Sequence, residues 1–148
     1  MNISMAERNN EIFVDSNYFI ALANENDSLH AQALAASRNI ENSGAHMHIS
    51  NLVFLEVVTV LSQKRNRDVA NTTGQYMLSD PRISFLHIDE QLHDRSWNVF
   101  QRIPQKNVGF IDCSIVTAME ELAVSTLLTF DQKDFRQLQR DYRFSFYE

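Results

Sequence analysis

The chain of 148 residues has one cysteine, three glycines and two prolines. Cys113 has no second thiol for an internal disulfide or a thiolate metal site, which favours a reducing compartment, the cytoplasm. The scarcity of glycine and proline argues against long linkers and disordered tracts. No apolar run approaches the ~20 residues that a membrane-spanning helix needs, and residues 1–10 lack the apolar core of a signal peptide. We therefore expect a polar N-terminal lead over residues 1–10 and one domain, with no membrane partner, over residues 11–148.

Positive charge is also in short supply. Lys and Arg number 13 against 19 Asp and Glu, which gives a formal net charge of −6. A protein that simply coats nucleic acid needs clustered positive charge, so this balance argues against that class. It is compatible with a nucleic-acid enzyme, because divalent cations would neutralise acids that converge on them. The positions of the acids therefore matter more than their number.

Hydrophobic periodicity predicts strands that alternate with helices. Strands are expected at residues 12–14, 46–49, 83–88, 124–130 and 143–146, and helices at residues 29–42, 52–61, 68–78, 90–102, 110–122 and 131–138, with a further helix beginning near Tyr18. Such alternation is typical of an α/β fold in which helices connect parallel strands. The helix at 52–61 is apolar on nearly every face, so we expect it to be buried.

Two acids directly follow predicted strands. Asp15 comes after the strand at 12–14, and Asp131 comes after the strand at 124–130. Ligands of an open parallel sheet gather outside the carboxyl ends of its strands, so both acids lie where a site is expected. Each also precedes a helix, where an Asp is a common N-cap, and capping explains either position equally well.

Three further acids lie on predicted helices. Glu56 lies within the apolar helix, where an unpaired carboxylate is costly; an ion pair with a Lys or Arg, or an edge position that reaches water, is the structural alternative. Asp112 lies in the first turn of helix 110–122, where the helix dipole also favours a negative charge. Asp134 follows Asp131 by three residues and is equally well explained as a solvated surface acid.

The combination of these acids suggests a metal site. Carboxylates that converge at strand ends raise one another's pKa, and a bound divalent cation removes that conflict. Mg²⁺ prefers oxygen ligands and retained waters, which suits a small group of carboxylates. The sequence therefore indicates a site for Mg²⁺ or Mn²⁺.

Four segments together resemble the PIN-domain nucleases and, among them, the VapC-type toxins of bacterial toxin–antitoxin pairs. These segments are residues 12–17, 50–57, 110–116 and 128–135, in the family's order and spacing. The resemblance extends from about Ile12 to Phe146. It implies a three-layer α/β/α PIN-like domain with a central, mostly parallel sheet. It also implies a metal-dependent endoribonuclease that leaves a 3′-hydroxyl and a 5′-phosphate, a cognate antitoxin, and a homodimer.

The resemblance assigns roles to individual residues. The catalytic acids, which also hold the metal, would be Asp15, Glu56, Asp112 and Asp131, with Asp134 as an alternate ligand. Polar groups that orient these acids or a water would be Ser16, Asn17 and Thr129. Contacts to RNA phosphates must come from basic side chains, and the candidates are Lys64, Arg65, Arg67 and Lys106, although a solvated helix end explains the first three equally well.

Two other functional classes are compatible with the sequence. One is a PIN-like binding module with degenerate catalysis; the complete set of acids argues against it, because a decayed site usually loses at least one. The other is a metal-dependent phosphatase acting on a small phosphate ester. The large apolar residues Met77, Met119 and Trp97 are interpreted as packing residues, and Tyr18 and Phe19 as core residues rather than base-stacking ones.

Overall fold

A single five-stranded sheet organises residues 10–148, which are the residues that this computed structural model describes. Its strands are β1 (Glu11–Val14), β2 (His46–Ser50), β3 (Ile83–Leu86), β4 (Thr126–Leu128) and β5 (Ser145–Phe146). They lie in the order β3-β2-β1-β4-β5, and every neighbouring pair is parallel. The prediction of a mostly parallel central sheet is confirmed.

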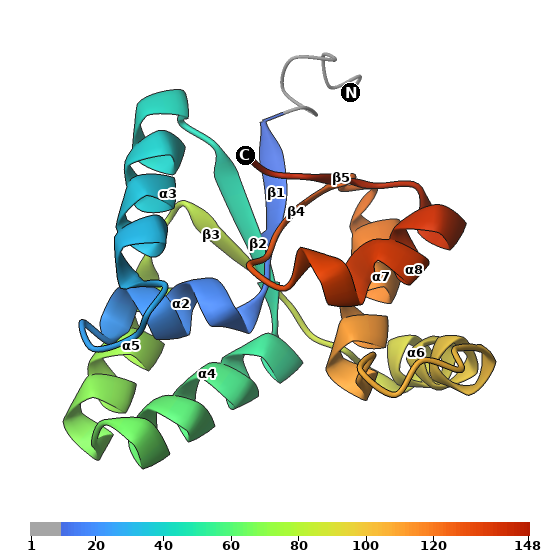
Figure 1. The fold of residues 1–148 in the computed structure, drawn as a ribbon, viewed down its shortest axis with the longest axis horizontal. Helices are drawn as coiled ribbons and strands as arrows, with labels where there is room; N and C mark the ends of the chain where they lie inside the picture. The colour runs from blue at the N-terminus through green and yellow to red at the C-terminus, as the bar shows by residue number, and fades with distance from the viewer. Residues whose placement is uncertain (1–9) are drawn as a thin grey trace.

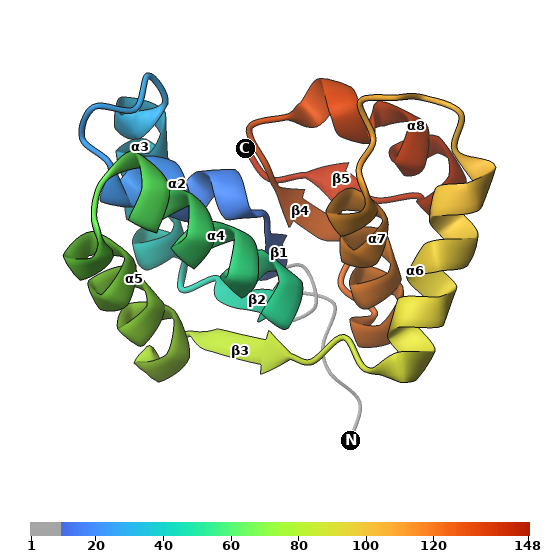
Figure 2. The ribbon, with the colours of Figure 1, turned by 90° about the horizontal axis from the view of Figure 1, so that it is seen from below.

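Helices cover the sheet on both sides. One group comprises α2 (Ser16–Ala23), α3 (His30–Ser43), α4 (Asn51–Lys64) and α5 (Arg67–Ser79), and the other comprises α6 (Glu90–Arg102), α7 (Phe110–Leu122) and α8 (Gln132–Tyr142). Figures 1 and 2 show the two groups on opposite sides of the strands. This is the expected three-layer α/β/α arrangement. The described part of the chain contains no helix with the length and apolarity required to span a membrane.

Side-chain caps mark the beginnings of several of these helices. The Ser50 hydroxyl accepts a hydrogen bond from the backbone N–H of Val53 at the start of α4. Asn66 caps α5 and Asp89 caps α6 in the same way. These residues satisfy backbone N–H groups that have no partner within the helix, so the short polar stretches in the sequence begin the helices where they do.

Helix α4 is buried along one stripe only, so the prediction that this helix is buried is correct for one face and wrong for the rest. Val53, Val57 and Leu61 are fully buried, whereas the side chain of Leu55 is 56% exposed. Helix α4 packs chiefly against α5 and α2, and residues spaced by four positions share the face that these neighbours cover. An apolar sequence therefore did not imply burial on every side.

Most of the large apolar side chains fill the core as expected. Tyr18, Phe19, Met77 and Met119 are all buried. Trp97 is an exception: it is 48% exposed on α6, so its interpretation as a packing residue is wrong.

Several element ends also differ from the sequence-based ranges. Strands β3 and β4 are shorter than expected, because only Ile83–Leu86 and Thr126–Leu128 pair with neighbours. Helix α8 is longer and continues to Tyr142. The predicted polar lead at residues 1–10 lies, apart from Asn10, outside the described residues, and the division into that lead and one domain stays a prediction.

The centre of the sheet brings the two strand-end acids together. Strands β1 and β4 are neighbours, with Val14 opposite Leu128, and the backbone N–H of Asp15 donates to the carbonyl of Leu128 at 2.9 Å. Asp15 therefore lies beside the segment 129–131. Helices α2 and α8 both begin at the carboxyl ends of these strands, so the polar residues at their first turns lie at this edge of the sheet.

Candidate active site

Asp15 is buried, and each of its carboxylate oxygens accepts a short hydrogen bond. It is the N-cap of α2, where Oδ1 accepts from the backbone N–H of Ser16 at 2.8 Å. Its Oδ2 accepts from the Thr129 hydroxyl at 2.8 Å. The capping role proposed as an alternative is therefore real, but it uses one oxygen only. The second oxygen is fixed by a residue from the neighbouring strand end.

Glu56 reaches the same place from α4. The Ser16 hydroxyl donates to Glu56 Oε1 at 2.6 Å and lies 3.4 Å from Asp15 Oδ1, so one hydroxyl contacts both acids. Of the two structural alternatives for Glu56, an ion pair with a Lys or Arg is not found within residues 10–148. Over the same residues, the other four acids form no ion pair either. The other alternative for Glu56, an edge position, agrees with its partial exposure beside the buried stripe of α4.

Asp131 joins the group through Asn17. The Asn17 amide donates to Asp131 Oδ2 and to the Thr129 hydroxyl oxygen, both at 3.2 Å, while its own oxygen accepts from the backbone N–H of Phe130. Asp131 is the residue before α8, but its side chain makes no capping hydrogen bond. Its carboxylate is therefore held by Asn17 rather than by the helix that follows.

Asp112 and Asp134 complete the group from α7 and α8. The backbone N–H of Gly109 donates to Asp112 Oδ2 at 3.0 Å, at the start of α7. The Asn107 amide donates to Asp134 Oδ1 at 2.7 Å. No sequence signal pointed to Asn107; the candidate residue in this loop was its charged neighbour Lys106.

The acids act on one another electrostatically. The pKa of Asp15 is raised to about 7: burial is the largest cause, the negative charges of Asp112 and Glu56 add to it, and hydrogen bonds from Thr129 and Ser16 oppose it. Burial likewise raises the pKa of Asp112 to about 6, with added contributions from Asp134, Glu56 and Asp131. All five predicted acids therefore share one electrostatic environment, in which negative charge is not compensated.

The donor set fits a hard divalent cation. Five carboxylates, with hydroxyl and amide oxygens beside them, offer the oxygen ligands that Mg²⁺ and Mn²⁺ prefer. In the described part of the chain, no three His, Cys, Asp or Glu side chains already enclose a single ion position. Binding would therefore require carboxylates to turn about their side-chain torsions, or to act through waters that Mg²⁺ retains.

The candidate RNA-binding residues lie in two places. Lys106 is exposed in the loop before α7, next to Asn107, and so lies at the rim of the acid cluster. Lys64, Arg65 and Arg67 lie at the opposite end of α4 from its first turn. Lys64 is eight residues beyond Glu56, which corresponds to roughly 12 Å along the helix axis.

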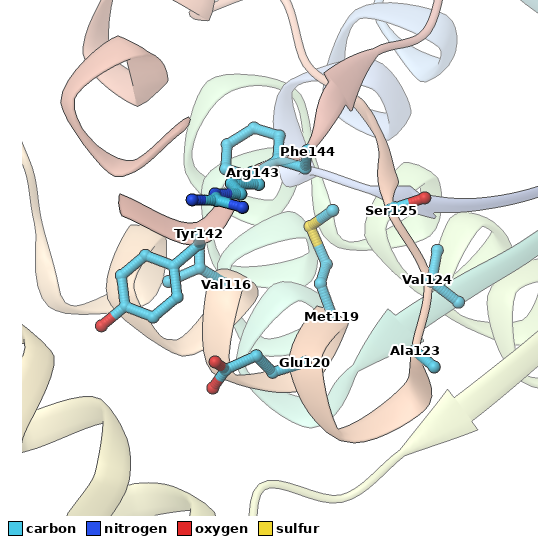
Figure 3. Close-up of a pocket in the computed structure, with 9 residues that line it drawn as sticks. All are labelled: Val116, Met119, Glu120, Ala123, Val124, Ser125, Tyr142, Arg143 and Phe144. Carbon is cyan, nitrogen blue, oxygen red and sulfur yellow. The ribbon is translucent and has the colours of Figure 1, made fainter. Parts of the chain in front are cut away.

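The cavity drawn in Figure 3 is separate from these acids. It measures about 190 Å³ and lies between α7 and the end of α8, where Tyr142, Arg143 and Phe144 form part of its wall. Val124 and Ser125, just before β4, also line it. It is therefore at the amino end of β4, whereas ligand sites of parallel sheets form at the carboxyl ends.

Comparison with known proteins places this arrangement in a family. The PIN domain family matches residues 12–141, a range that includes all five acids. The chain belongs to the PIN domain family. Among curated proteins, it is similar to the 23S rRNA-specific endonuclease VapC20 of two strains of Mycobacterium tuberculosis. The identity is 24% over 120 residues, which cover 81% of this chain and 88% of the relative.

Solved structures share the fold of this PIN domain. The crystal structure of Mycobacterium tuberculosis VapC20, described as a sarcin–ricin loop cleaving toxin, matches with a TM-score of 0.73 at 22% identity, over 83% of this chain and 92% of that one. VapBC2 from Rickettsia felis, bound to a promoter DNA fragment, matches with a TM-score of 0.65 at 13% identity, over 93% and 99% of the chains. A toxin–antitoxin complex from Klebsiella pneumoniae matches with a TM-score of 0.56 at 18% identity, over 84% of this chain and 90% of that one.

Proposed function

We propose that this PIN domain is a divalent-metal-dependent endoribonuclease and the toxin of a toxin–antitoxin pair. The observation that carries the proposal is the convergence of five carboxylates on one sheet edge without a cationic partner among residues 10–148. The family match and the similarity to an rRNA endonuclease support the same reading. Asp15, Glu56, Asp112 and Asp131 are the proposed catalytic acids, and Asp134 is the alternate ligand.

The polar neighbours keep the acids in place for this chemistry. Thr129 and Ser16 direct hydrogen bonds at Asp15 and Glu56, and Asn17 fixes Asp131. Side chains held in this way lose little freedom when a charged ligand binds, which favours an electrostatic site. Ser16, Asn17 and Thr129 are therefore positioning residues in the proposed enzyme.

The metal would be held by the carboxylates. A divalent cation bound there would activate a water and offset negative charge on the phosphate that is attacked. The chain itself would bind the cation through the ionised carboxylates of Asp15 and Asp112. Burial and repulsion between the acids favour the protonated form of both side chains, so both must lose a proton when the cation binds. Lys106, at the rim, is the basic side chain best placed to contact an RNA phosphate, while Lys64, Arg65 and Arg67 would contact only a longer substrate.

We also propose three features of its working context. A cognate antitoxin is supported by the similarity to two complexes, one titled VapBC2 and the other a toxin–antitoxin complex. A cytoplasmic location is consistent with a lone buried cysteine, which a reducing compartment keeps as a thiol.

A homodimer is supported by Trp97 and Phe100, which stack 5.6 Å apart on α6 while 48% and 36% exposed, because a second copy would cover this costly aromatic surface.

One comparison of substrates tests the proposal. The purified chain is incubated with a single-stranded RNA, the DNA of the same sequence, and a phosphomonoester, each in Mg²⁺, Mn²⁺ and EDTA. We expect metal-dependent cleavage of RNA only. Hydrolysis of the monoester alone would instead indicate a phosphatase. Binding of RNA without cleavage in either metal would indicate a degenerate binding module.

A further inference from the structure

A small cleft adjoins the acid cluster on the side away from α7. It has a volume of about 170 Å³ and lies between α3 and the segment that follows β4. Thr129 lines it, and the same residue donates a hydrogen bond to Asp15. Gln132, the next residue after Asp131, also lines it. A group bound in this cleft would therefore lie directly beside a bond cleaved at the acids.

The lining of the cleft selects against a phosphate. It contains no Lys or Arg, and its single charged side chain is that of Glu148. An anionic group would meet a negative charge and no cation, which makes the cleft unsuitable for the sugar–phosphate backbone. The occupant is therefore not an anionic group.

The lining also suits a flat ring with hydrogen-bonding edges. Three primary amides face the cleft, from Gln32, Asn39 and Gln132, and within residues 10–148 none of these amides has a hydrogen-bond partner. Tyr147 adds an aromatic ring, and its backbone N–H is tied to Leu127 at 2.8 Å, which fixes the segment that carries it. Amides pair bidentately with base edges, and aromatic side chains stack on unpaired bases.

The size of the cleft suits one small ring and excludes a drug-sized ligand. The cleft is smaller than the roughly 300–1,000 Å³ of sites for drug-sized ligands, and it is larger than the about 30 Å³ that one water occupies. We propose that this cleft holds one unpaired nucleobase next to the cleaved phosphate and that Gln32, Asn39 and Gln132 read its edge. The proposal rests on the nuclease function above and adds a determinant of sequence preference to it.

The test uses variants on the exposed side of α3. Ala35→Phe fills the cleft from an exposed position, and Ala31→Phe is its control on the same helix outside the cleft. Asn39→Leu removes one reading amide, and Asn42→Leu is its control at an exposed position that does not line the cleft. None of these residues contacts an acid of the active site.

Two readouts separate this proposal from the nuclease proposal. Cleavage is measured on RNA oligonucleotides that differ only in the base on either side of the cut. Binding of the same oligonucleotides is measured by fluorescence anisotropy in EDTA, so that it does not depend on catalysis. We expect the wild type to prefer one base about tenfold or more, which is the scale of one bidentate amide–base pair. Asn39→Leu should lose most of that preference, and Ala35→Phe should weaken binding of every oligonucleotide relative to Ala31→Phe.

The proposal is overturned if Ala35→Phe and Asn39→Leu bind and discriminate as their controls do. That result would also be obtained if the cleft serves a protein partner instead. Absence of cleavage by the wild type would defeat the nuclease function but would leave the binding comparison to decide about the cleft.

Discussion

The Thr129 hydroxyl donates a hydrogen bond of 2.8 Å to Asp15 Oδ2, across 114 positions of sequence. This contact joins the ends of β1 and β4 and fixes the most buried acid of the site, whose residue is 5% exposed. It also lowers the pKa of Asp15 against the larger effect of burial. Thr129 therefore favours the ionised carboxylate that the proposed metal binding would require.

Replacing Thr129 by Val should destabilise the protein by about 1–3 kcal/mol, because a buried charged acceptor loses its partner. The loss should be larger at pH 8, where Asp15 is ionised, than at pH 5. Urea denaturation at the two pH values measures it. Thr126→Val, in β4 three residues before Thr129 and without a side-chain hydrogen bond within residues 10–148, is the control and should cost little. Equal losses at both positions would contradict the role given to Thr129.

Asp15→Asn and Asp112→Asn should each reduce RNA cleavage by at least roughly 10²–10³-fold, the scale for removing one electrostatic group from an active site. Both variants keep a side chain of the same shape, so the fold should persist by circular dichroism. Asp141→Asn, at an exposed position on α8, is the matched control. Undiminished cleavage by either active-site variant would show that the acids are wrongly assigned.

Divalent metal should stabilise the folded chain. Ligand at 100 times its Kd contributes about 2.7 kcal/mol to the free energy of unfolding when it binds only the folded state. We therefore expect Mg²⁺ or Mn²⁺ to raise the Tm of the wild type, and Asp112→Asn to remove most of that rise. A Tm that does not change over a metal titration would count against a cation site at these carboxylates.

Without metal, the acids should make stability fall as pH rises. Burial raises the pKa of Asp15 from its ordinary 3.8 to about 7, so between these values the folded state holds a proton that the unfolded chain has released. Folding is therefore disfavoured progressively from pH 4 to pH 7, by on the order of 4 kcal/mol at most for this group. In EDTA, Asp15→Asn should accordingly gain stability relative to the wild type as pH rises. If the difference in unfolding free energy between Asp15→Asn and the wild type did not change with pH, the raised pKa of Asp15 would be contradicted.

The aromatic pair on α6 gives a prediction about assembly. Trp97→Glu places a charge on the surface proposed to meet a second copy, so it should convert the dimer to a monomer in light scattering after size exclusion. Leu78→Glu alters another exposed apolar side chain, on α5, which is 58% exposed, and should leave the dimer intact. A wild type that is monomeric at high concentration, or a Trp97→Glu dimer, would contradict the homodimer.

Much of this site could be anticipated because its acids follow from topology. Asp15 and Asp131 directly follow strands that are neighbours in a parallel sheet, and such strand ends meet at one edge. Glu56 stood out as an acid in an apolar helix, although that helix proved to be buried along one stripe only. The upward direction of the pKa shifts was predicted from the convergence of the acids, but their largest cause, burial, required the three-dimensional structure.

Other features of the fold and the site could not be predicted from a sequence pattern. Asn107 contacts Asp134 because the loop before α7 passes over the start of α8, and a loop path is not encoded in periodicity. Strand ends at Leu86 and Leu128 depend on where a neighbour stops pairing, which apolar runs do not mark. The cleft beside Thr129 combines α3 with the last residues of the chain, and no local motif joins them.

The account depends on carboxylates from the end of β1, from α4 and from α7 acting together on one cation. The most direct measurement is anomalous scattering from crystals of the chain soaked in Mn²⁺. We expect a peak among Asp15, Glu56 and Asp112 that disappears in Asp112→Asn. The account would be contradicted by crystals that show no Mn²⁺ peak among these side chains, although the side chains are accessible and the Mn²⁺ concentration is one that supports RNA cleavage.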